Sequence, residues 1–497
     1  MFLYELFNNH LEVIIPEFFL SIILFSLLLF GVFFKIKNNN QKILIHNNLN
    51  TIISFLLIIL LILNINVNTT SMTVLNGVLI IDALSQFIKS ILILSTLICF
   101  LIQQPYLLQQ KITEYEINIL LLISLLGLML LVSSNNFITL YLAVEIQSLS
   151  FYILTASQKK SNLSVEASLK YFILGSIASG FILYGSSILY GISGSLNFSY
   201  FFLITSNINF LENIDILTSI LYGLVFVLSG ILFKIGAVPF HFWLPDVYEG
   251  APNNITAFFA IVPKIAFVGL LIRFVFDVFI DLSFFLENFF YIIALLSMLI
   301  GSLTALQQKK IKRLLAYSSI SHIGFIMIGF ASNLIDNIPF ILLYIIIYII
   351  MSINLWTSYL SLNINHKPIK YLSELSNLFK INSLLSLIIV LNILSLAGIP
   401  PLAGFFSKLF IFFSSIKGSF IDLIFFAIII SIISSFYYLR IVKIIYFEKK
   451  IKYLFLSQIN KAQSIILLIN TQIILFLFIY PNILLVALNK IYLYFLI

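Results

Sequence analysis

The sequence predicts an all-α polytopic membrane protein, and its composition is the first of three observations behind that prediction. Of its 497 residues, 61% are hydrophobic and only 9% are charged, whereas soluble domains carry about 25% charged residues. Second, the apolar residues are concentrated in runs of roughly 20, the length that crosses a bilayer as a helix. Third, Pro and Gly residues interrupt two of these runs, which predicts helices that break inside the membrane.

We expect about 14 transmembrane helices in a single transmembrane domain that covers the whole chain, 1–497. The stretch Ser193–Ile214 is expected to be a polar and aromatic loop between two of them. The predicted helices, bounded by the limits of the apolar runs, are 11–33, 51–66, 80–102, 117–134, 136–155, 166–191, 215–238, 253–277, 286–306, 313–332, 338–361, 381–399 continuing through 401–416, 420–446 and 463–487.

Two predicted helix breaks divide the chain into repeats. The seventh helix meets Pro239, and the twelfth meets Pro400 and Pro401. Interrupted helices at corresponding places in two halves are the best sequence indication of an inverted-repeat transporter. Lys234 precedes its Pro and Lys408 follows its Pro pair, which suits opposite orientations. The predicted divisions are 1–115 with helices 1–3, 116–278 with helices 4–8 as the first repeat, 286–448 with helices 9–13 as the second repeat, and 463–487 as helix 14.

The charged residues of the loops support this helix count. Most Lys and Arg residues fall in loops after odd-numbered helices, and the opposite loops hold mainly acidic residues. The positive-inside rule then places the odd-numbered loops in the cytoplasm or the mitochondrial matrix. The connection His241–Pro252 is the exception, because it has no Lys or Arg but contains Asp246 and Glu249. It is expected to pack into the protein, either as a Pro-rich cap or with a direct chemical role for its acids.

Some classes of function are excluded by features that the sequence lacks. The net charge of +8 comes without a basic patch interleaved with aromatic residues, so no nucleic-acid partner is expected. Cys99 is the only cysteine, which excludes a disulfide within the chain and a cysteine-based metal site. There is no Rossmann fingerprint, P-loop or haem motif, so no redox cofactor is expected in this chain.

Four ionisable residues inside apolar runs form the candidate proton-transfer site: Glu145, Lys234, Lys264 and Lys408. A charge at mid-bilayer costs at least ~2.5–3.5 kcal/mol unless a partner, water or neutralisation offsets it. A Glu–Lys pair that forms and separates can act as a proton switch, and lysines joined by polar groups and water can act as a relay. The alternatives are a static ion pair of Glu145 with Lys234 and, for Lys264 and Lys408, side chains that extend to the membrane surface.

Other ionisable residues have open interpretations. Lys89 and Arg273 lie near predicted helix ends, so their side chains are expected to extend to the membrane surface. Glu166 and Lys170 stand four residues apart and form either a local helix pair or part of the functional site.

Two histidines complete the candidate site. The pKa of an ordinary histidine suits proton transfer near neutral pH, which gives His241 and His322 a possible place in the relay. Each is equally well interpreted as a hydrogen-bonding residue of a membrane helix.

Five stretches resemble the antiporter-like membrane subunits of respiratory complex I, and most closely the family of NADH dehydrogenase subunit 2. They lie within residues 135–415 and are EIQSLSFYIL, EASLKYFILGSIASG, FKIGAVPFHFWLPDVYEGAPNNITAFFAIVPKIA, QKKIKRLLAYSSISHIGF and LAGIPPLAGFFSKLFIF. The FHFWLPD element is shared with the other antiporter-like subunits and with multisubunit cation/proton antiporters, whereas the continuation DVYEGAP indicates subunit 2. Residues 1–75 and 449–497 match no motif of the family.

This resemblance implies 14 helices with two inverted five-helix repeats and discontinuous helices 7 and 12. It also implies roles for residues of the candidate site. The family's charged pair corresponds to Glu145 and Lys234, its central lysine to Lys264 and its exit-side residue in the second half to Lys408, while His241 and His322 fall on motif positions.

The function that the resemblance implies is proton translocation in an NADH:ubiquinone oxidoreductase. NADH, FMN, iron–sulfur clusters and ubiquinone would bind to partner subunits, and this chain would have no redox centre. The partners would be other membrane-arm subunits of complex I, including neighbouring antiporter-like subunits, and membrane lipids. The location would be the mitochondrial inner membrane or, alternatively, a bacterial plasma membrane. The rival interpretations are a subunit of a multisubunit cation/proton antiporter and a structural spacer of the membrane arm.

Overall fold

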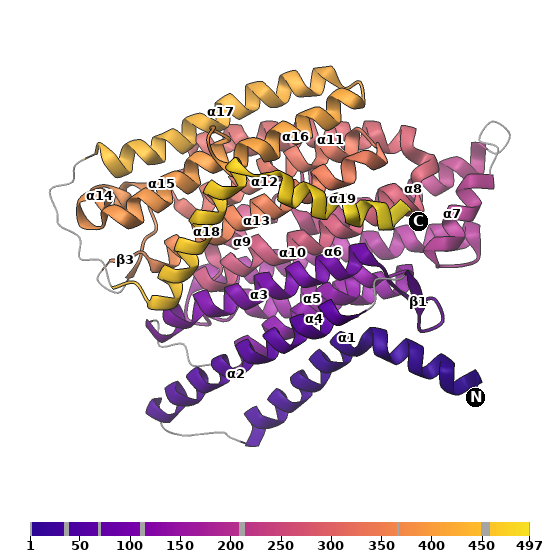
Figure 1. Ribbon diagram of the computed structural model, residues 1–497, viewed down its shortest axis with the longest axis horizontal. Coiled ribbons are helices and arrows are strands. Elements are labelled where there is room, and N and C mark those ends of the chain that lie inside the picture. Colours follow the sequence, from indigo (N-terminus) through magenta and orange to yellow (C-terminus); the bar gives the residue numbers. More distant parts are fainter. Residues whose placement is uncertain are drawn as a thin grey trace.

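A computed structural model describes residues 2–33, 39–67, 71–109, 115–207, 214–364, 367–448 and 458–496. Helices make up most of this part of the chain and gather into one bundle (Figure 1). The α-helices are α1 (Phe2–Phe33), α2 (Asn39–Asn66), α3 (Ala83–Gln109), α4 (Glu116–Ser133), α5 (Phe137–Thr155), α6 (Asn162–Ser193), α7 (Phe198–Asn207), α8 (Ile214–Ile235), α9 (Trp243–Gly250), α10 (Asn253–Arg273), α11 (Ser283–Gln307), α12 (Ile311–Ala331), α13 (Ile338–Ser361), α14 (Leu378–Ile381), α15 (Ser383–Ala397), α16 (Ala403–Lys417), α17 (Ile421–Tyr446), α18 (Lys461–Ile479) and α19 (Asn482–Leu496).

Shorter elements connect these helices. A π-helical turn, Phe274–Val278, continues α10. Two antiparallel hairpins lie in loops, the first formed by β1 (Met72–Val74) and β2 (Leu79–Ile81) and the second by β3 (Asn363–Ile364) and β4 (Lys367–Pro368). The 3₁₀ turns are Ile280–Leu282, Ile335–Asn337 and Leu372–Leu375.

The predicted all-α fold with many membrane-spanning helices is confirmed. Within the described ranges, 13 helices are long and apolar enough to cross a membrane. α15 and α16 are each shorter, and they follow one another around the segment 398–402, as the predicted broken helix 12 requires. With this pair counted as one span, the total is the expected 14. The inverted relation between two five-helix repeats stays a prediction.

The predicted helix 463–487 is wrong in its second half. α18 ends at Ile479, and α19 begins at Asn482, just after Pro481. A proline lacks the backbone N–H that a helix interior needs, and its ring clashes with the preceding turn, so the two helices separate there. α18 packs along α13, and α19 packs against α13 and α3 (Figure 1).

Two predicted loops contain helices. The stretch Ser193–Ile214 includes α7, and its residues 208–213 lie outside the described part of the chain. The connection His241–Pro252 includes α9, in which Pro245 occupies the first turn, where its missing N–H has no helical partner to lose. The apolar side chains of α9 are buried, so the prediction that this connection packs into the protein is confirmed.

Helices 2 and 3 begin at other residues than predicted. α2 starts at Asn39 instead of residue 51. A helix can continue through polar residues outside the membrane, because water there forms hydrogen bonds with the backbone N–H groups of its first turn. α3 starts at Ala83 instead of 80, after the hairpin β1–β2. Strands of three residues are too short to give a recognisable alternation of polar and apolar residues.

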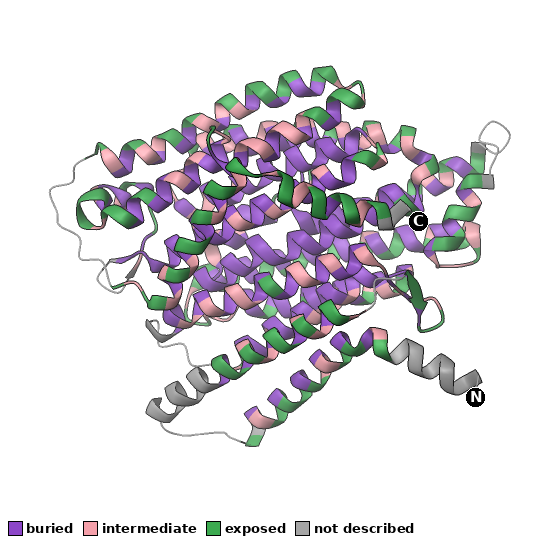
Figure 2. Cartoon of the chain, in the orientation of Figure 1, coloured by how far each residue is buried: buried purple, intermediate pink, exposed green. Residues whose placement is uncertain are grey.

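The centre of the bundle consists of α10, α12 and α13. Every side chain of α10 is buried, as are nearly all side chains of the other two helices. Figure 2 shows this buried centre, with exposed residues along outer helices such as α1, α2 and α17. Those exposed residues include large apolar ones such as Phe25, Phe55 and Phe425. An apolar outer surface of this extent suits contact with lipid chains or with neighbouring membrane subunits.

Polar caps begin several helices around the site. The side chain of Asn136 accepts a hydrogen bond from the backbone N–H of Ile138 at 3.0 Å and starts α5. Ser161 and Asn382 cap α6 and α15 in the same way. Because the first N–H groups of a helix have no partner within it, these side chains stabilise the observed starts.

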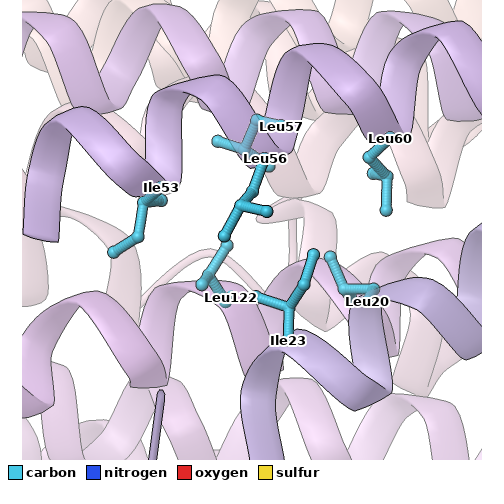
Figure 3. Close-up of a pocket in the computed structure, with 7 residues that line it drawn as sticks. All are labelled: Leu20, Ile23, Ile53, Leu56, Leu57, Leu60 and Leu122. Carbon is cyan, nitrogen blue, oxygen red and sulfur yellow. The ribbon is translucent and has the colours of Figure 1, made fainter. Parts of the chain in front are cut away.

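The first helices pack around an apolar pocket. Side chains from α1, α2 and α4 face one another there (Figure 3), and all are aliphatic: Leu20, Ile23, Ile53, Leu56, Leu57, Leu60 and Leu122. With no polar lining, this pocket has nothing to bind an ion or a proton, so the candidate site lies elsewhere in the bundle.

Two buried ion pairs attach α3 and its preceding loop to other helices. Lys89 on α3 pairs with Glu17 on α1 at 2.5 Å, and Arg273 at the end of α10 makes two contacts with Asp82, at 2.9 and 3.0 Å. Both cations are almost fully buried. The prediction that Lys89 and Arg273 extend to the membrane surface is therefore wrong. A carboxylate partner instead offsets the cost of burying each charge.

Candidate functional site

Two helix breaks lie at the centre of the candidate site. The first separates α8 from α9, where Gly236 has a φ of +84° and the indole N–H of Trp243 donates to the carbonyl of Phe233 at 2.8 Å. The second separates α15 from α16, where Gly398 has a φ of +83°. Glycine adopts this left-handed conformation without the steric cost of a side chain, which allows each helix to end sharply.

At each break, the ammonium group of a lysine lies near the C-terminal end of the helix that precedes the break. Lys234 lies in the last turn of α8. Lys408 lies on α16, and its ammonium donates a 2.7 Å hydrogen bond to the carbonyl of Ala397, the last residue of α15. The carbonyl end of a helix carries partial negative charge and favours a cation. A side chain at Gly398 would collide with Lys408, since a Cβ there would lie 2.8 Å from its Cδ.

The buried lysines of the site differ from the other buried cations in their partners. Lys234, Lys264 and Lys408 are only 4%, 3% and 6% exposed. In the described ranges, none of them forms an ion pair with a carboxylate. Each ammonium instead lies over an aromatic ring, at 5.7, 5.1 and 5.1 Å from the ring centres of Tyr152, Tyr348 and Phe325 respectively. An aromatic face attracts a cation but does not neutralise its charge.

The structure does not join Glu145 and Lys234 directly. The hydroxyl of Ser148 donates to Oε2 of Glu145 at 3.3 Å and also lies within hydrogen-bonding reach of Tyr152. Lys234 donates to the hydroxyl of Tyr152 at 3.5 Å, the long limit for such a bond. Glu145, Ser148 and Tyr152 share one face of α5, because they are separated by about one and two helical turns. Two hydroxyl groups therefore connect the acid to the lysine.

Glu145 lies at the outer surface of the chain, although Lys234 is buried. It is partly exposed, and on the same side of α5 the residues Ile138, Leu142 and Leu149 are exposed. An ionisable group that borders such an apolar surface is placed to respond to a molecule packed against α5.

A second set of hydroxyl groups surrounds Lys264. Its ammonium donates to the hydroxyl of Tyr348 on α13 at 3.0 Å. The hydroxyl of Ser319 on α12 lies within hydrogen-bonding reach of both Tyr348 and Tyr248, the latter on α9. Polar groups from three further elements thus converge near the central lysine of α10.

His322 of α12 lies near Lys264 of α10 and Lys408 of α16. Its Nδ1 and Nε2 form hydrogen bonds of 2.8 and 3.2 Å with the hydroxyls of Tyr344 and Tyr438. Both Lys264 and Lys408 are near enough to act electrostatically on the ring. In a neutral imidazole one nitrogen donates and the other accepts, so His322 can receive and release a proton through opposite sides of its ring.

His241 lies apart from this row. It is buried in the break between α8 and α9 beside the ring of Phe242. Its Nδ1 has no hydrogen-bond partner among the described residues. The structure therefore links Glu145 with Lys234 through hydroxyl groups, brings Lys234 and Lys264 to the lining of one small cavity, and places His322 near both Lys264 and Lys408. His241 lies outside this row.

The acids of α9 bind cations of α6, of α12 and of the residue that precedes α12. Asp246 contacts Lys170 of α6 at 3.0 Å and Arg313 of α12 at 3.1 Å, while Glu249 pairs with Lys310 and Arg313. Lys170 also forms the expected local pair with Glu166 at 2.8 Å. These ion pairs are partly exposed, so their contribution to stability is modest, but they fix the position of α9 beside the first break.

The hydroxyl groups of the row were not identified from the sequence. Serine and tyrosine are common in membrane helices and carry no charge, so they give no signal comparable to that of a buried lysine. A weak signal was present in their spacing. Ser148 and Tyr152 follow Glu145 by three and seven residues, and Tyr344 and Tyr348 are one turn apart, which places each set on one helix face.

The described residues contain no group of three His, Cys, Asp or Glu side chains arranged to hold a metal ion. What the arrangement offers chemically is a series of proton donors and acceptors across the buried centre of the bundle. In order these are Glu145, Ser148, Tyr152, Lys234, Lys264, Tyr348, His322, Tyr344, Tyr438 and Lys408.

Comparisons with known proteins complete this description. The family described as "NADH:quinone oxidoreductase/Mrp antiporter, TM" matches residues 134–434. NADH-ubiquinone oxidoreductase chain 2 of Marchantia polymorpha is 36% identical over 479 residues, which cover 96% of this chain and 97% of that protein. NADH-quinone oxidoreductase subunit N of Pelagibacter ubique is 37% identical over 483 residues, which cover 97% and 99%.

Two solved structures have a similar fold. A chain of respiratory complex I from Thermus thermophilus has a TM-score of 0.78 and 25% sequence identity, over 95% of this chain and 99% of that one. A chain of the Mrp complex from Dietzia sp. has a TM-score of 0.80 over 97% of both chains. The second likeness concerns the fold alone, since the sequence identity is 18%.

Proposed function

This chain belongs to the NADH:quinone oxidoreductase/Mrp antiporter family of transmembrane proteins, and on that premise we propose that it is a proton-translocating membrane subunit of NADH:quinone oxidoreductase, respiratory complex I. Relatives that are 36–37% identical over nearly the full length are named chain 2 or subunit N of that enzyme. The proposal is therefore that this multi-pass membrane protein is one subunit of an enzyme complex.

The observation on which the proposal rests is the contrast between two kinds of buried cation. Lys89 and Arg273 are buried with carboxylate partners, which hold them in their charged forms. Lys234, Lys264 and Lys408 are also buried, but they have no carboxylate partner in the described ranges. A lysine in that situation can lose its proton and regain it, and ionisable residues retained inside a membrane commonly form ion or proton pathways.

We infer a sequence of steps from the order of the row. A change in charge at the surface of α5 alters how strongly Glu145 stabilises the protonated form of Lys234. The hydroxyl groups of Ser148 and Tyr152 transmit this effect. Lys234 then passes a proton towards Lys264, and His322 and its tyrosine partners lie on the way to Lys408. Lys408 releases the proton to the positive side of the membrane. No covalent chemistry beyond proton transfer is required of this chain.

The partners follow from the same proposal. The exposed stripe of α5 beside Glu145 is suited to a neighbouring antiporter-like subunit of the membrane arm, and other exposed apolar faces are suited to lipids. NADH, FMN, iron–sulfur clusters and ubiquinone belong to partner subunits, where electron transfer takes place. The membrane is the mitochondrial inner membrane or a bacterial plasma membrane.

The test is replacement of Lys264 by Met in the assembled complex. Methionine keeps the length of the aliphatic chain but has no proton to transfer. We expect proton pumping per NADH oxidised to fall by roughly 10²-fold, the lower range of what a proton-transfer group contributes. Inverted membrane vesicles give the pumping, and native gels give the assembly.

The control for that test is Lys417→Met, because Lys417 is an exposed lysine on α16. It should leave pumping unchanged. Normal pumping by assembled Lys264→Met complex would refute the relay. A variant series that abolishes assembly but never lowers pumping in complex that does assemble would favour the structural spacer.

The rival proposal, a multisubunit cation/proton antiporter, is supported by the description of the matching family, which names the Mrp antiporter beside NADH:quinone oxidoreductase. Mild extraction of native membranes followed by native electrophoresis separates the two proposals. Migration of this chain with flavin and iron–sulfur subunits in a particle that oxidises NADH supports complex I. Migration with other antiporter-like chains alone would transfer the assignment to the antiporter.

A further inference from the structure

A small enclosed cavity lies between the first two lysines of the row. Lys234 and Lys264 both line it, together with Gln147 of α5 and Tyr248 of α9. Its volume, measured for the centre of a water-sized sphere, is about 10 Å³, which is enough for one water molecule. The remaining lining residues are mostly apolar, so only a few polar groups face the cavity.

Gln147, which lines this cavity, has a polar side-chain atom without a hydrogen-bond partner among the described residues. The residue is 1% exposed, and its carbonyl oxygen Oε1 has no hydrogen-bond partner among the described residues. A buried carbonyl without a partner costs free energy, so buried amides nearly always bind protein groups or ordered water. An unpartnered amide oxygen beside a cavity that has room for one water molecule indicates that a water molecule occupies the cavity.

Within the described residues, no hydrogen bond joins the two lysines to each other. Lys234 donates towards Tyr152, which is on the Glu145 side of the row, and Lys264 donates to Tyr348, which is on the His322 side. At the step from Lys234 to Lys264, no hydroxyl group of the described residues is hydrogen-bonded to both lysines, although Tyr248 lines the cavity between them. The cavity lies at that step.

We propose that Gln147 holds a single water molecule between Lys234 and Lys264, and that this water carries the proton from one lysine to the other. The inference rests on the proposed function. In the step, an N–H bond of the Lys234 ammonium breaks as the water oxygen gains that proton. Another O–H bond of the water breaks as the neutral Lys264 amine gains its proton. The water is regenerated, and Gln147 Oε1 accepts a hydrogen bond that orients it.

Gln147 is thus a positioning residue and does not itself exchange protons. Its amide fixes where the water lies, and the two nitrogens supply the donor and the acceptor. Because Gln147 and Glu145 both belong to α5, a movement of that helix would displace the water relative to the lysines. This gives the outer surface of α5 a second way to influence the first proton step.

The first experiment is a cryo-electron-microscopy map of the native complex at a resolution that resolves ordered waters. We expect one water peak within hydrogen-bonding distance of Gln147 Oε1, between the two lysine nitrogens. A dry cavity, or a Gln147 amide bonded to another side chain, would overturn the inference. This measurement requires no variant and so does not depend on folding.

The second experiment replaces Gln147 by Met, which keeps the side-chain length but removes the acceptor. We expect pumping per NADH in assembled complex to fall roughly threefold to tenfold, the factor that one hydrogen bond is worth, and the solvent deuterium isotope effect on pumping to increase. Gln103→Met is the matched control, because Gln103 is a buried glutamine of α3 that contacts Asn118 at 3.4 Å. The control should change neither quantity.

The outcomes separate this inference from the proposed function. If Lys234→Met and Lys264→Met complexes lose pumping while Gln147→Met retains it with an unchanged isotope effect, the water site is refuted and the relay stands. If the lysine variants pump normally, the relay itself fails and the water site fails with it.

Discussion

At the scale of single residues, the presence or absence of a carboxylate separates structural cations from the cations of the candidate site. The Asp82–Arg273 pair belongs to the structural kind. Burial acts to raise the pKa of Asp82, but the Arg273 guanidinium and hydrogen bonds from Ser85 outweigh that effect and hold the pKa below its ordinary value. A carboxyl group with a lowered pKa stabilises the folded state above its unfolded-state pKa, and this stabilisation is lost as the pH falls through the folded-state pKa.

Replacement of Asp82 by Asn tests this structural role. Arg273 would remain buried without a counter-charge, and such a loss costs about 3–5 kcal/mol. We expect a lower thermal unfolding temperature and less assembled complex at neutral pH, measured by native electrophoresis after a series of heating steps. The exposed acid Asp422 provides the control, since Asp422→Asn leaves no buried cation uncompensated. Equal heat resistance of the two variants would contradict the assignment.

The sequence identified the buried cations but not the partners that distinguish them. Lys234, Lys264 and Lys408 were found because charge is rare in apolar runs. The Glu17–Lys89 pair, in contrast, joins residues 72 positions apart, and Asp82 and Arg273 are 191 apart. Such pairs are set by the three-dimensional packing of helices, and no local spacing rule indicates them. The interpretation of Lys89 and Arg273 was therefore wrong, whereas the proton-transfer role of the central lysines stays a prediction.

At the scale of secondary-structure elements, the helix breaks determine where the lysines lie. Pro and Gly residues predicted both breaks, because they act on the backbone locally. The same rule applied to Pro481 would have separated α18 from α19, but the apolar run continues past that proline. The apolar residues on both sides of Pro481 thus obscured the helix break that this proline indicates, and the predicted helix 463–487 is too long.

Replacement of Gly398 by Ala tests the second break. Gly398 and Gly194 both have left-handed backbone conformations, with φ of +83° and +68°, so alanine strains each by about 1 kcal/mol. Only at Gly398 would the new Cβ meet a site residue, Lys408, while open space surrounds Gly194. We expect both variants to lose a little thermal stability and only Gly398→Ala to lower proton pumping. Equal pumping by the two assembled variants would show that the break does not position Lys408.

At the scale of the whole molecule, the row of polar groups runs from the surface of α5 through the most buried helices to α16. Only its first member, Glu145, is partly exposed. A change outside this chain therefore reaches the lysines most directly at that end. The fold thus separates the partly exposed Glu145 from the buried centre through which we propose that the proton moves.

Replacement of Glu145 by Gln tests that separation. The amide keeps the shape of the side chain but cannot ionise, so Lys234 would no longer respond to the neighbour. We expect pumping to fall roughly tenfold, within the range of coupling between distant sites, while assembly remains normal. Glu116→Gln, at an exposed position in the first turn of α4, serves as the control in the same vesicle assay. Unchanged pumping in Glu145→Gln complex would exclude Glu145 as the sensing group.

The packing of α18 has a consequence for how the protein is made. Gln463 at the start of α18 donates a 3.1 Å hydrogen bond to the carbonyl of Ile102 on α3, across 361 positions of sequence. α3 is therefore synthesised long before its neighbour α18. The flank of α3 that contacts α18 must therefore be covered by lipid or by an insertion factor until α18 has been synthesised. The order of synthesis thus makes closure of the bundle a late event, and a ribosome that stalls before α18 leaves an incomplete bundle in the membrane.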